Sequence, residues 1–485
     1  MDDARRRARR TRGVSSTAPQ SFPPRALPSP LNVAILAAGQ GKRMRSSRPK
    51  VLHPIAGRPM VAHVIDAART LAPRAIAVVV GHGGDAVERT LAAPDLTFVR
   101  QDPPRGTGDA ARVALAALPP DGVTLVGLGD VPLVPAAALA SLVTAARHGR
   151  LALLTARVSD PAGLGRVVRN EAGQVAAIVE DRDADDAVRR LDEINTGFMA
   201  APTALLARWV AQLRPDNAQN EFYLTDAVAL ARADGVDVVA ELAADESDVR
   251  GVNDRAQLAA VERIVQRRRA DALLQAGVAL ADPARIDVRG SLDCGADVFI
   301  DIGCVFEGLV RLADGARVGP YCVLRDVTVG RGTTIEPFSH LEGAEIGDQA
   351  RVGPFARLRP GASLGDEVHI GNFVEIKAST LKRGAKANHL AYIGDSEVGE
   401  RVNYGAGSIT ANYDGVNKHR TVIADDAHVG SNCVLVAPVR IGAGATIGGG
   451  STIVDDVPAG TLAVARARQV LIPGWQRPRK PPKQP

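Results

Sequence analysis

Aliphatic residues recur at every sixth position in two stretches of the C-terminal half: Val352, Leu358, Leu364, Ile370 and Ile376, then Val429, Leu435, Ile441, Ile447 and Ile453. The position four residues later is small or β-branched: Ala356, Ala362, Val368 and Val374, then Cys433, Val439, Ala445 and Ser451. A period of six fits neither the 3.6-residue period of an α-helix nor the two-residue alternation of a half-buried strand. It predicts a chain that turns a corner every six residues and points one aliphatic and one small side chain inward, as in the hexapeptide repeats of a parallel β-helix.

The N-terminal half shows a different pattern, in which short apolar runs alternate with Ala-rich stretches of helical periodicity. A first strand begins at Asn32, and both residues 76–80 and the run that ends at Gly129 are apolar or β-branched throughout, as in a buried parallel sheet. Residues 61–72 lie between two of these runs and are typical of a helix. The alternation predicts a doubly wound, Rossmann-like α/β domain.

These patterns divide the chain into four predicted segments. Residues 1–30 are an Arg- and Pro-rich extension that we expect to be disordered, and residues 31–253 form the α/β domain. Residues 254–276 form a connecting helix with Leu258, Val261 and Val265 on one face. Residues 277–485 form the β-helix domain and a C-terminal tail, with the hexads running from about Ile286 to Val457.

The formal net charge of +5 raises the question of nucleic-acid binding, but its distribution argues against it. Residues 1–30 hold seven Arg and two Asp, and four further Arg and Lys lie in the last nine residues, so the body between them is mildly acidic. A basic footprint confined to two Pro-rich tails is weak support for a nucleic-acid partner. The sequence contains no apolar run long enough to span a bilayer and no apolar core after the N-terminal arginines, so we also expect no membrane partner and no secretory signal.

The cysteines show no CxxC spacing, and all four lie in the repeat region: Cys294, Cys304, Cys322 and Cys433. Two of them, Cys322 and Cys433, stand four residues after an aliphatic residue, in the small inward position. We therefore predict free thiols that act as small apolar side chains, rather than disulfides or metal ligands. This use of cysteine indicates a reducing cytoplasm.

A first candidate site follows the first strand, where the sequence LAAGQGKRM covers residues 36–44. A Gly-rich turn after a parallel strand exposes N–H groups that can hold phosphate oxygens, and Lys42, Arg43 and Lys50 add positive charge nearby. Gly106-Thr107-Gly108 offers a second such turn. Asp130 ends an apolar strand, where open α/β sheets bind ligands, and beside a polyphosphate it is a natural Mg²⁺ ligand. The alternative is that Asp130 only caps a helix or a turn, because Pro132 follows it.

A second candidate site lies where the hexads fail, after Ile376 and again before Val429. A tolerated surface loop is the alternative explanation for such a break. These two breaks, with the residues just upstream, are rich in chemistry-bearing side chains: Arg359, Lys377, His389, Tyr392, Asn412, Tyr413 and Lys418. A neutral histidine is well matched to accept a proton at neutral pH, and the cations can hold a sugar phosphate.

The motif at residues 36–44 resembles the opening motif of the sugar nucleotidyltransferases. Together with 193–197 (EINTG), 220–226 (NEFYLTD) and 251–253 (GVN), it resembles the uridylyltransferase half of the bifunctional N-acetylglucosamine-1-phosphate uridylyltransferase/glucosamine-1-phosphate N-acetyltransferase family. HLAYIGD, NYGAG and NYDGxNK, in that order, resemble the acetyltransferase half. The resemblance runs from about Asn32 to the C-terminal tail.

For the N-terminal half, the resemblance implies UTP and N-acetylglucosamine-1-phosphate as substrates, with Mg²⁺. The implied nucleotide-binding residues are Leu36, Ala37, Ala38, Gly39, Arg43, Lys50, Gln101, Gly106, Thr107, Leu128, Gly129 and Asp130. The implied sugar-binding residues are Gly165, Glu180, Asn195 and Asn253. Asp130 and Asn253 would bind the metal ion.

For the C-terminal half, the resemblance implies acetyl-CoA and glucosamine-1-phosphate as substrates, with His389 as general base and Asn412 at the reacting acetyl group. The implied sugar-phosphate residues are Arg359, Lys377, Tyr392, Asn403 and Lys418. The implied acetyl-CoA residues are Ala406, Asn412, Tyr413, Ser431, Gly449 and Arg466. The resemblance also implies a left-handed coil and a homotrimer with the acetyl-transfer site between neighbouring solenoids.

Four residues depart from the family pattern. Lys42 replaces a usual Thr, Asp109 stands where His is commoner, and Leu128 and Leu164 stand where Tyr is usual. We expect the two leucines to remove a hydroxyl each from the nucleotide and sugar pocket, and Asp109 to add an anion near the phosphates. Two alternative functions remain at this point: a single-activity nucleotidyltransferase with a structural β-helix, and a non-enzymatic scaffold.

Overall fold

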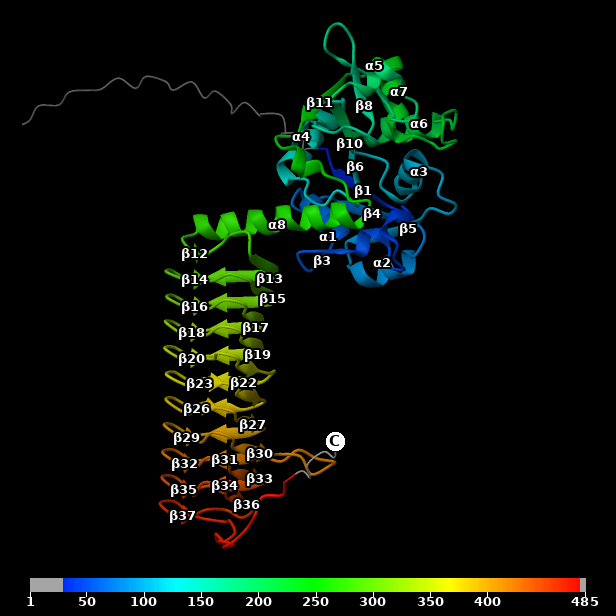
Figure 1. The fold of residues 1–485 in the computed structure, drawn as a ribbon. Helices are drawn as coiled ribbons and strands as arrows, with labels where there is room; N and C mark the ends of the chain where they lie inside the picture. Colours follow the sequence, from blue (N-terminus) through cyan, green and yellow to red (C-terminus); the bar gives the residue numbers. More distant parts are fainter. Residues whose placement is uncertain (1–28, 480–485) are drawn as a thin grey trace, which may run out of the picture.

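The computed structural model describes residues 29–479, and Figure 1 shows a compact α/β part joined by one long helix to an extended solenoid. The disorder predicted for residues 1–30 lies outside the described residues, except at the last two positions. In this described range, the structure contains no helix long and apolar enough to cross a membrane.

The α/β part is built on one twisted sheet with the strand order β11 (Val238–Leu242), β7 (Leu151–Arg157), β10 (Glu193–Pro202), β6 (Val123–Leu128), β1 (Leu31–Ala37), β4 (Ala75–Val80) and β5 (Leu96–Arg100). The strands are parallel except β10, which is antiparallel to both neighbours. β10 follows the hairpin of β8 (Arg166–Arg169) and β9 (Val175–Val179), rather than the helical crossover that parallel strands need. The predicted doubly wound fold is confirmed, with this one reversal.

Helices cover both faces of the sheet, and the side chains of β1 alternate between two cores. Val33 and Ile35 pack in the core under α1 (Met60–Arg69), α2 (Gly84–Leu91) and α4 (Ala136–Arg147). Ala34 and Leu36 pack in the core under α3 (Thr107–Ala117), α6 (Thr203–Gln212) and α7 (Ala227–Ala233). Burial on both faces explains why these strands are apolar without alternation. The remaining short elements are η1 (Lys42–Met44), η2 (Lys50–Leu52), β2 (Pro54–Ile55), β3 (Arg58–Pro59), α5 (Asp186–Arg189), η3 (Leu224–Asp226) and η4 (Glu246–Val249).

The solenoid has three faces. The β23 face stacks β12 (Ala279–Leu280), β14 (Phe299–Ile300), β16 (Arg317–Val318), β18 (Thr334–Ile335), β20 (Arg351–Val352), β23 (His369–Asn372), β26 (Lys386–His389), β29 (Asn403–Tyr404), β32 (His428–Val429), β35 (Thr446–Ile447) and β37 (Leu462–Ala463). The other two faces begin as long strands that turn the corner, β13 (Ile286–Cys294), β15 (Cys304–Leu312), β17 (Val323–Val329) and β19 (His340–Ile346).

After β19 these strands divide. The β24 face continues with β21 (Arg357–Leu358), β24 (Glu375–Lys377), β27 (Tyr392–Gly394), β30 (Ile409–Ala411), β33 (Val434–Val436) and β36 (Thr452–Ile453). The β25 face continues with β22 (Ala362–Leu364), β25 (Thr380–Leu381), β28 (Ser396–Val398), β31 (Thr421–Ile423) and β34 (Val439–Ile441). We name the edge between the first two faces the β23–β24 corner, and the edge between the last two the β24–β25 corner.

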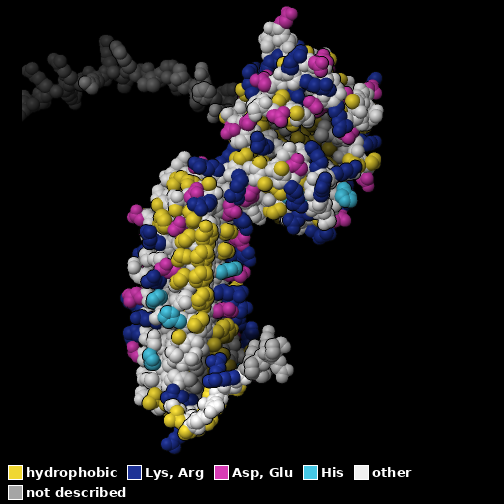
Figure 2. Space-filling view, viewed as in Figure 1, with side chains coloured by type: hydrophobic (Ala, Val, Ile, Leu, Met, Phe, Trp, Pro, Cys, Tyr) yellow, Lys and Arg dark blue, Asp and Glu magenta, His cyan; other side chains and the backbone are white. Residues whose placement is uncertain are grey.

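The predicted six-residue period is confirmed, because every aliphatic and small position of the two hexad series is buried in one continuous solenoid core. Each such buried aliphatic side chain contributes about 1.5–3 kcal/mol. The solenoid extends past the predicted limits at both ends, to β12 and β37. The four cysteines are free thiols, as predicted, and three of them are fully buried. On the face shown in Figure 2, hydrophobic side chains form a stripe down the solenoid among charged residues.

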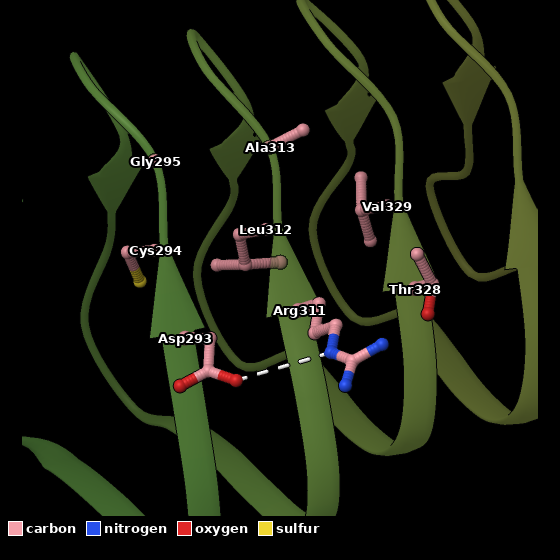
Figure 3. A pocket seen from close by; sticks show the side chains of 8 residues that line it. All are labelled: Asp293, Cys294, Gly295, Arg311, Leu312, Ala313, Thr328 and Val329. Carbon is pink, nitrogen blue, oxygen red and sulfur yellow. Dashed lines mark ion pairs between the residues drawn. The ribbon is translucent and has the colours of Figure 1, made fainter.

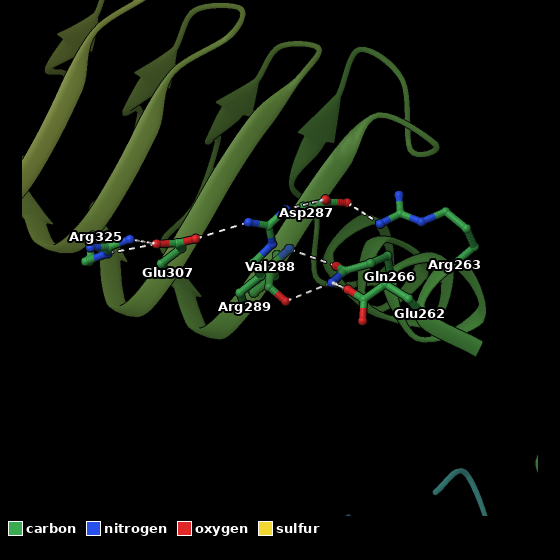
Figure 4. A network of polar contacts seen from close by, with 8 residues as sticks. All are labelled: Glu262, Arg263, Gln266, Asp287, Val288, Arg289, Glu307 and Arg325. Atoms are coloured by element: carbon green, nitrogen blue, oxygen red, sulfur yellow. Dashed lines mark hydrogen bonds and ion pairs between the residues drawn. The ribbon is translucent and has the colours of Figure 1, made fainter. Parts of the chain in front are cut away.

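Helix α8 (Arg255–Gln275) joins the two parts, and its predicted apolar face packs on the α/β part through Val261. Toward the solenoid, Ala270 and Leu273 join the solenoid core, and the polar contacts in Figure 4 lie beside them. The Gln266 side chain donates to the carbonyl of Val288 at 3.0 Å and accepts from its N–H at 2.8 Å, so it caps the edge of β13 as a strand would. Glu262 accepts from Gln266 at 2.8 Å and from the N–H of Ala56 at 2.7 Å. The helix therefore bonds to both parts through adjacent side chains.

Candidate active sites

The implied nucleotide residues lie together at the carboxyl ends of β1, β5 and β6. The N–H of Gly129 donates to the carbonyl of Leu36 at 2.9 Å, which holds the two strand ends side by side. Leu36 and Ala37 end β1, and Ala38 and Gly39 follow it in an open turn. This edge is where open α/β sheets bind their ligands.

Lys50, Asp130 and Asn253 converge at this edge from three separate segments. The Lys50 Nζ donates to Asn253 Oδ1 at 3.2 Å and forms an ion pair with the carboxylate of Asp130. The Asp130 carboxylate and Asn253 Oδ1 therefore both face the position that the Lys50 ammonium occupies. Two such oxygen ligands are the kind that Mg²⁺ prefers, so the donor set fits this ion. In residues 29–479, no group of three or more His, Cys, Asp or Glu side chains could hold a metal ion, so this site would rest on Asp130, Asn253 and the phosphates.

The Gly-rich turn makes room for Lys50. Gly41 has a left-handed φ of 60°, and a Cβ there would lie 2.6 Å from the Cβ of Lys50. Glycine is therefore required both by the backbone conformation and by the close approach of the lysine. Arg43 lies exposed in η1 beside this turn, free to reach an anion above the sheet edge.

Gln101, Gly106 and Thr107 form the second part of the nucleotide edge. The Gln101 Nε2 donates to the carbonyl of Gly106 at 3.0 Å, and the Thr107 hydroxyl accepts from the N–H of Leu224 at 3.1 Å. The second contact ties this turn to the segment 220–226, which the sequence had marked as a separate motif. Asp109 adds a carboxylate beside this turn, but that carboxylate is 2% exposed and is paired with two arginines.

Gly165, Glu180 and Asn195 also come together. The N–H of Asn195 donates to the carbonyl of Gly165 at 2.8 Å, and a Cβ on Gly165 would lie 3.2 Å from the Glu180 carboxylate. Burial raises the pKa of Glu180, while the Thr225 hydroxyl, which donates to it at 3.2 Å, opposes the rise. Of the two unusual leucines, Leu164 is 38% exposed on the surface, whereas Leu128 is half-buried and packs against both cores of the sheet.

In the solenoid, His389 ends β26 at the β23–β24 corner, one coil below Asn372. The two residues are register partners, and His389 Nδ1 lies 2.7 Å from Asn372 Oδ1. A carbonyl oxygen can only accept, so Nδ1 carries the proton and the exposed Nε2 is left as a base. Sequence reasoning missed Asn372, because an asparagine seventeen positions away carries no local signal.

The residues below His389 at the same corner are small and stacked. The N–H of Asn432 donates to the carbonyl of Ala406, and that of Gly450 to the carbonyl of Ser431, each at 2.8 Å. Arg466 donates to the carbonyl of Gly449 at 2.7 Å. The implied acetyl-CoA residues Ala406, Ser431, Gly449 and Arg466 therefore form one continuous column that leads away from His389.

The implied sugar-phosphate residues lie mostly at the β24–β25 corner, around Asp395. Lys377 Nζ contacts both oxygens of Asp395, at 3.0 and 3.2 Å, and the Asn412 amide donates to the same carboxylate. A Cβ on Gly394 would lie 2.4 Å from the Tyr392 hydroxyl and 2.8 Å from Asn412 Nδ2, so these two side chains meet over the glycine. Arg359 lies nearby and pairs with Glu375 at 2.9 Å. Asp395 was not among the predicted site residues, although it ends one of the motifs.

The insertion of residues 412–420 covers this corner. Asp414 holds its turn by accepting from the N–H groups of Val416 at 2.8 Å and Asn417 at 2.6 Å. Lys418 lies beside Lys377, and this neighbouring positive charge lowers the pKa of Lys418. Two lysines brought together in this way are suited to a dianionic phosphate, which relieves their mutual repulsion. Tyr413 is 61% exposed on the same insertion.

One implied residue is placed apart from this cluster. Asn403 is on the β23 face, where its amide lies 3.2 Å from His428 Nδ1. The acetyl-site residues of one chain are thus spread over two corners and the β23 face, and in residues 29–479 no hydrogen bond or ion pair connects His389 with the cluster around Asp395.

A shallow groove of about 390 Å³ near the top of the solenoid lies away from both sites. Figure 3 shows its lining: Asp293, Cys294, Gly295, Arg311, Leu312, Ala313, Thr328 and Val329. Burial raises the pKa of the Cys294 thiol to about 11, so this thiol is neutral and a weak nucleophile at physiological pH.

Comparison with known proteins agrees with the two-part architecture. Residues 33–196 match the MobA-like NTP transferase domain, and residues 343–378 and 420–455 match the bacterial transferase hexapeptide repeats.

Three relatives match more than nine-tenths of the chain, each described as "Bifunctional protein GlmU". The relative from Methylibium petroleiphilum is 60% identical over 458 residues, covering 93% of this chain and 99% of its own. The relative from Polaromonas naphthalenivorans is 59% identical, with 93% and 99% covered, and that from Cupriavidus pinatubonensis is 55% identical, with 94% and 100% covered. At this identity and coverage, the chain belongs to the GlmU family of bifunctional proteins.

Proposed function

We propose that the chain makes UDP-N-acetylglucosamine in two steps. The solenoid transfers an acetyl group from acetyl-CoA to glucosamine-1-phosphate, and the α/β part then transfers a uridylyl group from UTP to the N-acetylglucosamine-1-phosphate formed. The observation that carries the proposal is the presence of two separately built polar sites, Lys50–Asp130–Asn253 at the sheet edge and His389–Asn372 on the solenoid. We assign the steps to residues 31–253 and 277–485, with 254–276 as the connection.

In uridylyl transfer, a phosphate oxygen of the sugar phosphate attacks the α-phosphorus of UTP, and pyrophosphate leaves. The reaction needs no protein nucleophile, so catalysis consists of positioning two anions and balancing their charge. Lys50 and Arg43 are the cations at the sheet edge, and Gly165, Glu180 and Asn195 form the side where the sugar would lie. Mg²⁺, held by Asp130 and Asn253, would supply further charge neutralisation on the phosphates.

In acetyl transfer, the sugar amine attacks the thioester carbonyl carbon, the carbon–sulfur bond breaks, and coenzyme A leaves as the thiol. The amine must lose a proton as it attacks, and His389 Nε2 is placed to take it. The Asn412 amide can donate to the carbonyl oxygen as negative charge develops there. Arg359, Lys377 and Lys418 are the cations for the sugar phosphate.

We propose a homotrimer in which neighbouring solenoids complete each other's acetyl site. Three features support this. The base and the cation cluster of one chain lie at different corners of the solenoid, and Asn403 lies on the β23 face, in the coil next to the base. Above His389 the same corner carries a stacked ladder of half-exposed rings, Tyr321, Phe338, Phe355 and Phe373, with centroids 5.0–5.3 Å apart. At the C-terminal end Leu471, Ile472 and Trp475 are more than 60% exposed.

An apolar ladder of this size on a surface is typical of a protein–protein interface. Each ring residue has a left-handed φ of 56–59°, a conformation that costs a residue with a side chain roughly 1–2 kcal/mol. Burial against a second copy would offset that cost. We also propose a cytoplasmic location, which the four free thiols support.

Two single variants test the function. We expect His389→Ala to lose acetyl transfer by a factor on the order of 10²–10⁴ while keeping uridylyl transfer. Asp130→Ala should do the reverse. The measurement is UDP-N-acetylglucosamine formation from glucosamine-1-phosphate and UTP, with and without acetyl-CoA, beside each half-reaction alone. If a folded His389→Ala protein keeps full acetyl transfer, His389 is not the base. If the wild type shows no acetyl transfer, the solenoid has only a structural role and the single-activity alternative holds.

A further inference from the structure

Asp109 lies in the first turn of α3, and its side chain is almost completely buried. Three side chains donate hydrogen bonds to its carboxylate. Gln101 Nε2 donates to one carboxylate oxygen at 3.0 Å, Arg105 donates to the other at 3.0 Å, and Arg112 contacts that same oxygen. Burial alone would raise the pKa of the carboxyl, but the hydrogen bonds from Gln101, Arg112 and Arg105 outweigh burial and lower the pKa. Asp109 is therefore ionised at neutral pH and can only accept hydrogen bonds.

The charge of Asp109 fixes which way the Gln101 amide points. One end of that amide faces two acceptors, the Gly106 carbonyl and the Asp109 carboxylate, each at 3.0 Å. Neither can donate, so this end must be the NH₂ group and the opposite end must be the carbonyl Oε1. Within residues 29–479, no group donates a hydrogen bond to Gln101 Oε1. This oxygen is also not one of the fully buried side-chain atoms that lack a partner, so it is accessible to solvent. It is an acceptor facing the nucleotide edge.

The two arginines hold Asp109 in this role. Their guanidinium carbons each lie 5.9 Å from the centroid of the Phe222 ring, and the N–H of Phe222 donates to the carbonyl of Arg105 at 2.8 Å. Phe222 therefore packs against both arginines, and the two arginines in turn hold the Asp109 carboxylate and offset its negative charge.

We propose that Asp109 is a specificity-determining residue of the nucleotide site, which fixes the Gln101 amide so that Oε1 accepts from an imide N–H of the base. This inference rests on the proposed uridylyl-transfer function. Uracil carries an N–H at ring position 3, which Oε1 can accept. Cytosine carries an unprotonated nitrogen there, whose lone pair would face Oε1, so cytosine is disfavoured by repulsion. Asp109 acts through Gln101 and is a positioning residue.

The test compares Asp109→Asn with the wild type for UTP, CTP and 3-methyl-UTP, which lacks the N–H. An asparagine can present its own NH₂ to Gln101, so one of the two contacts that orient the Gln101 amide is lost and only the Gly106 carbonyl still opposes a flip. We expect the ratio of kcat/KM for UTP over CTP to fall on the order of tenfold, and the preference for UTP over 3-methyl-UTP to narrow in parallel. Asp121→Asn is the matched control, because its exposed carboxylate pairs with Arg74 at the opposite edge of the sheet.

A second pair of variants separates positioning from folding. In a Gln101→Met background, Asp109→Asn should change the UTP/CTP ratio no further, since the amide that it orients is gone. Acetyl transfer by the same polypeptide reports that the solenoid is folded, and the Tm of the α/β part beside that of the wild type reports whether the mutated part is folded. If Asp109→Asn fails to fold, Gln101→Met must still lower the ratio. An unchanged ratio in an active, folded Asp109→Asn or Gln101→Met enzyme overturns this inference, whereas a wild type without UTP-dependent pyrophosphate release overturns the proposed function instead.

Discussion

At the scale of single residues, the chemistry of the proposed acetyl site depends on a side chain that touches no substrate. Asn372 Oδ1 lies 2.7 Å from His389 Nδ1 and fixes the tautomer that leaves Nε2 as the base. The two residues are register partners in adjacent coils, so the backbone ladder sets their separation. A base held in this way needs no reorientation before it accepts a proton.

We therefore predict that Asn372→Ala lowers kcat for acetyl transfer by about 10–100-fold with little change in KM, because the ring loses its orienting acceptor. Asn372→Asp keeps an acceptor and adds a negative charge that stabilises the imidazolium form. It should recover part of the rate and move the acidic limb of the pH–rate profile to higher pH. Uridylyl transfer serves as the internal control. Equal KM and kcat losses in both variants, with an unmoved pH profile, would indicate a purely structural asparagine.

The buried thiols give a second prediction at this scale. Burial raises the pKa of Cys304 to about 11 and that of Cys322 to about 12, so both stay protonated at pH 8. We expect a thiol reagent at pH 8 to leave these two unmodified in the native protein and to modify all four cysteines after denaturation. Mass spectrometry of labelled peptides makes the comparison. Rapid native labelling of Cys322 would show that the solenoid core opens.

At the scale of elements, the repeat pattern was readable because each hexad is completed by neighbours close in sequence. Val352 and Ile370 are register partners in adjacent coils, so residues that repeat along the sequence also stack on one another in the solenoid. The reversed strand β10 and the first coil at β12 lack such a local signal. The hand of the coil also has none, since period six fits either hand, and only the family resemblance implies it.

The site residues follow the same rule. Asp130 and His389 stand in recognisable motifs, whereas Asn372, Asp395 and Thr225 were missed as site residues because their partners come from other coils or strands. Asp109 was visible as a departure, but its meaning required Arg105 and Arg112 to be placed around it. The sequence therefore locates the side chains that act on substrates better than the side chains that position those catalytic groups.

Helix α8 yields a prediction at the element scale. Gln266 is 3% exposed and bonds to both backbone groups of Val288. Arg269 also donates to the Val288 carbonyl, so Gln266→Met should leave the buried N–H unpaired and the carbonyl with Arg269 alone. We expect the free energy of unfolding of the solenoid to fall by about 2 kcal/mol or more, seen as a lower Tm in calorimetry. Arg263→Met on the same helix is the control, because its ion pair with Asp287 is half-exposed and is worth at most about 1 kcal/mol. Equal shifts in the two variants would contradict a special role for Gln266.

At the scale of the whole molecule, the arrangement of the acetyl-site groups suggests why the solenoid has a regular, extended shape. A prism with flat faces can present a base at one corner and a phosphate-binding cluster at the next. When several chains assemble, the base of one chain can then face the phosphate-binding cluster of its neighbour. The ladder of Tyr321, Phe338, Phe355 and Phe373 ends beside His389, since Phe373 follows Asn372 directly. A contact made through the ladder would therefore bring a neighbouring chain to the base.

Subunit complementation tests this arrangement. His389→Ala lacks the base and Lys377→Met lacks a phosphate-binding cation, so each homo-oligomer should be inactive in acetyl transfer. If each site takes its base from one chain and its cations from the next, every mixed trimer holds one intact site out of three, so the isolated mixed species should recover about a third of the wild-type rate. The two variants are co-expressed with different tags and the mixed species is isolated through both. Uridylyl transfer should stay at the wild-type level in every sample. If the mixed species shows no recovery of acetyl transfer, the base and the cations that serve one substrate come from the same chain, and the assembly has another purpose.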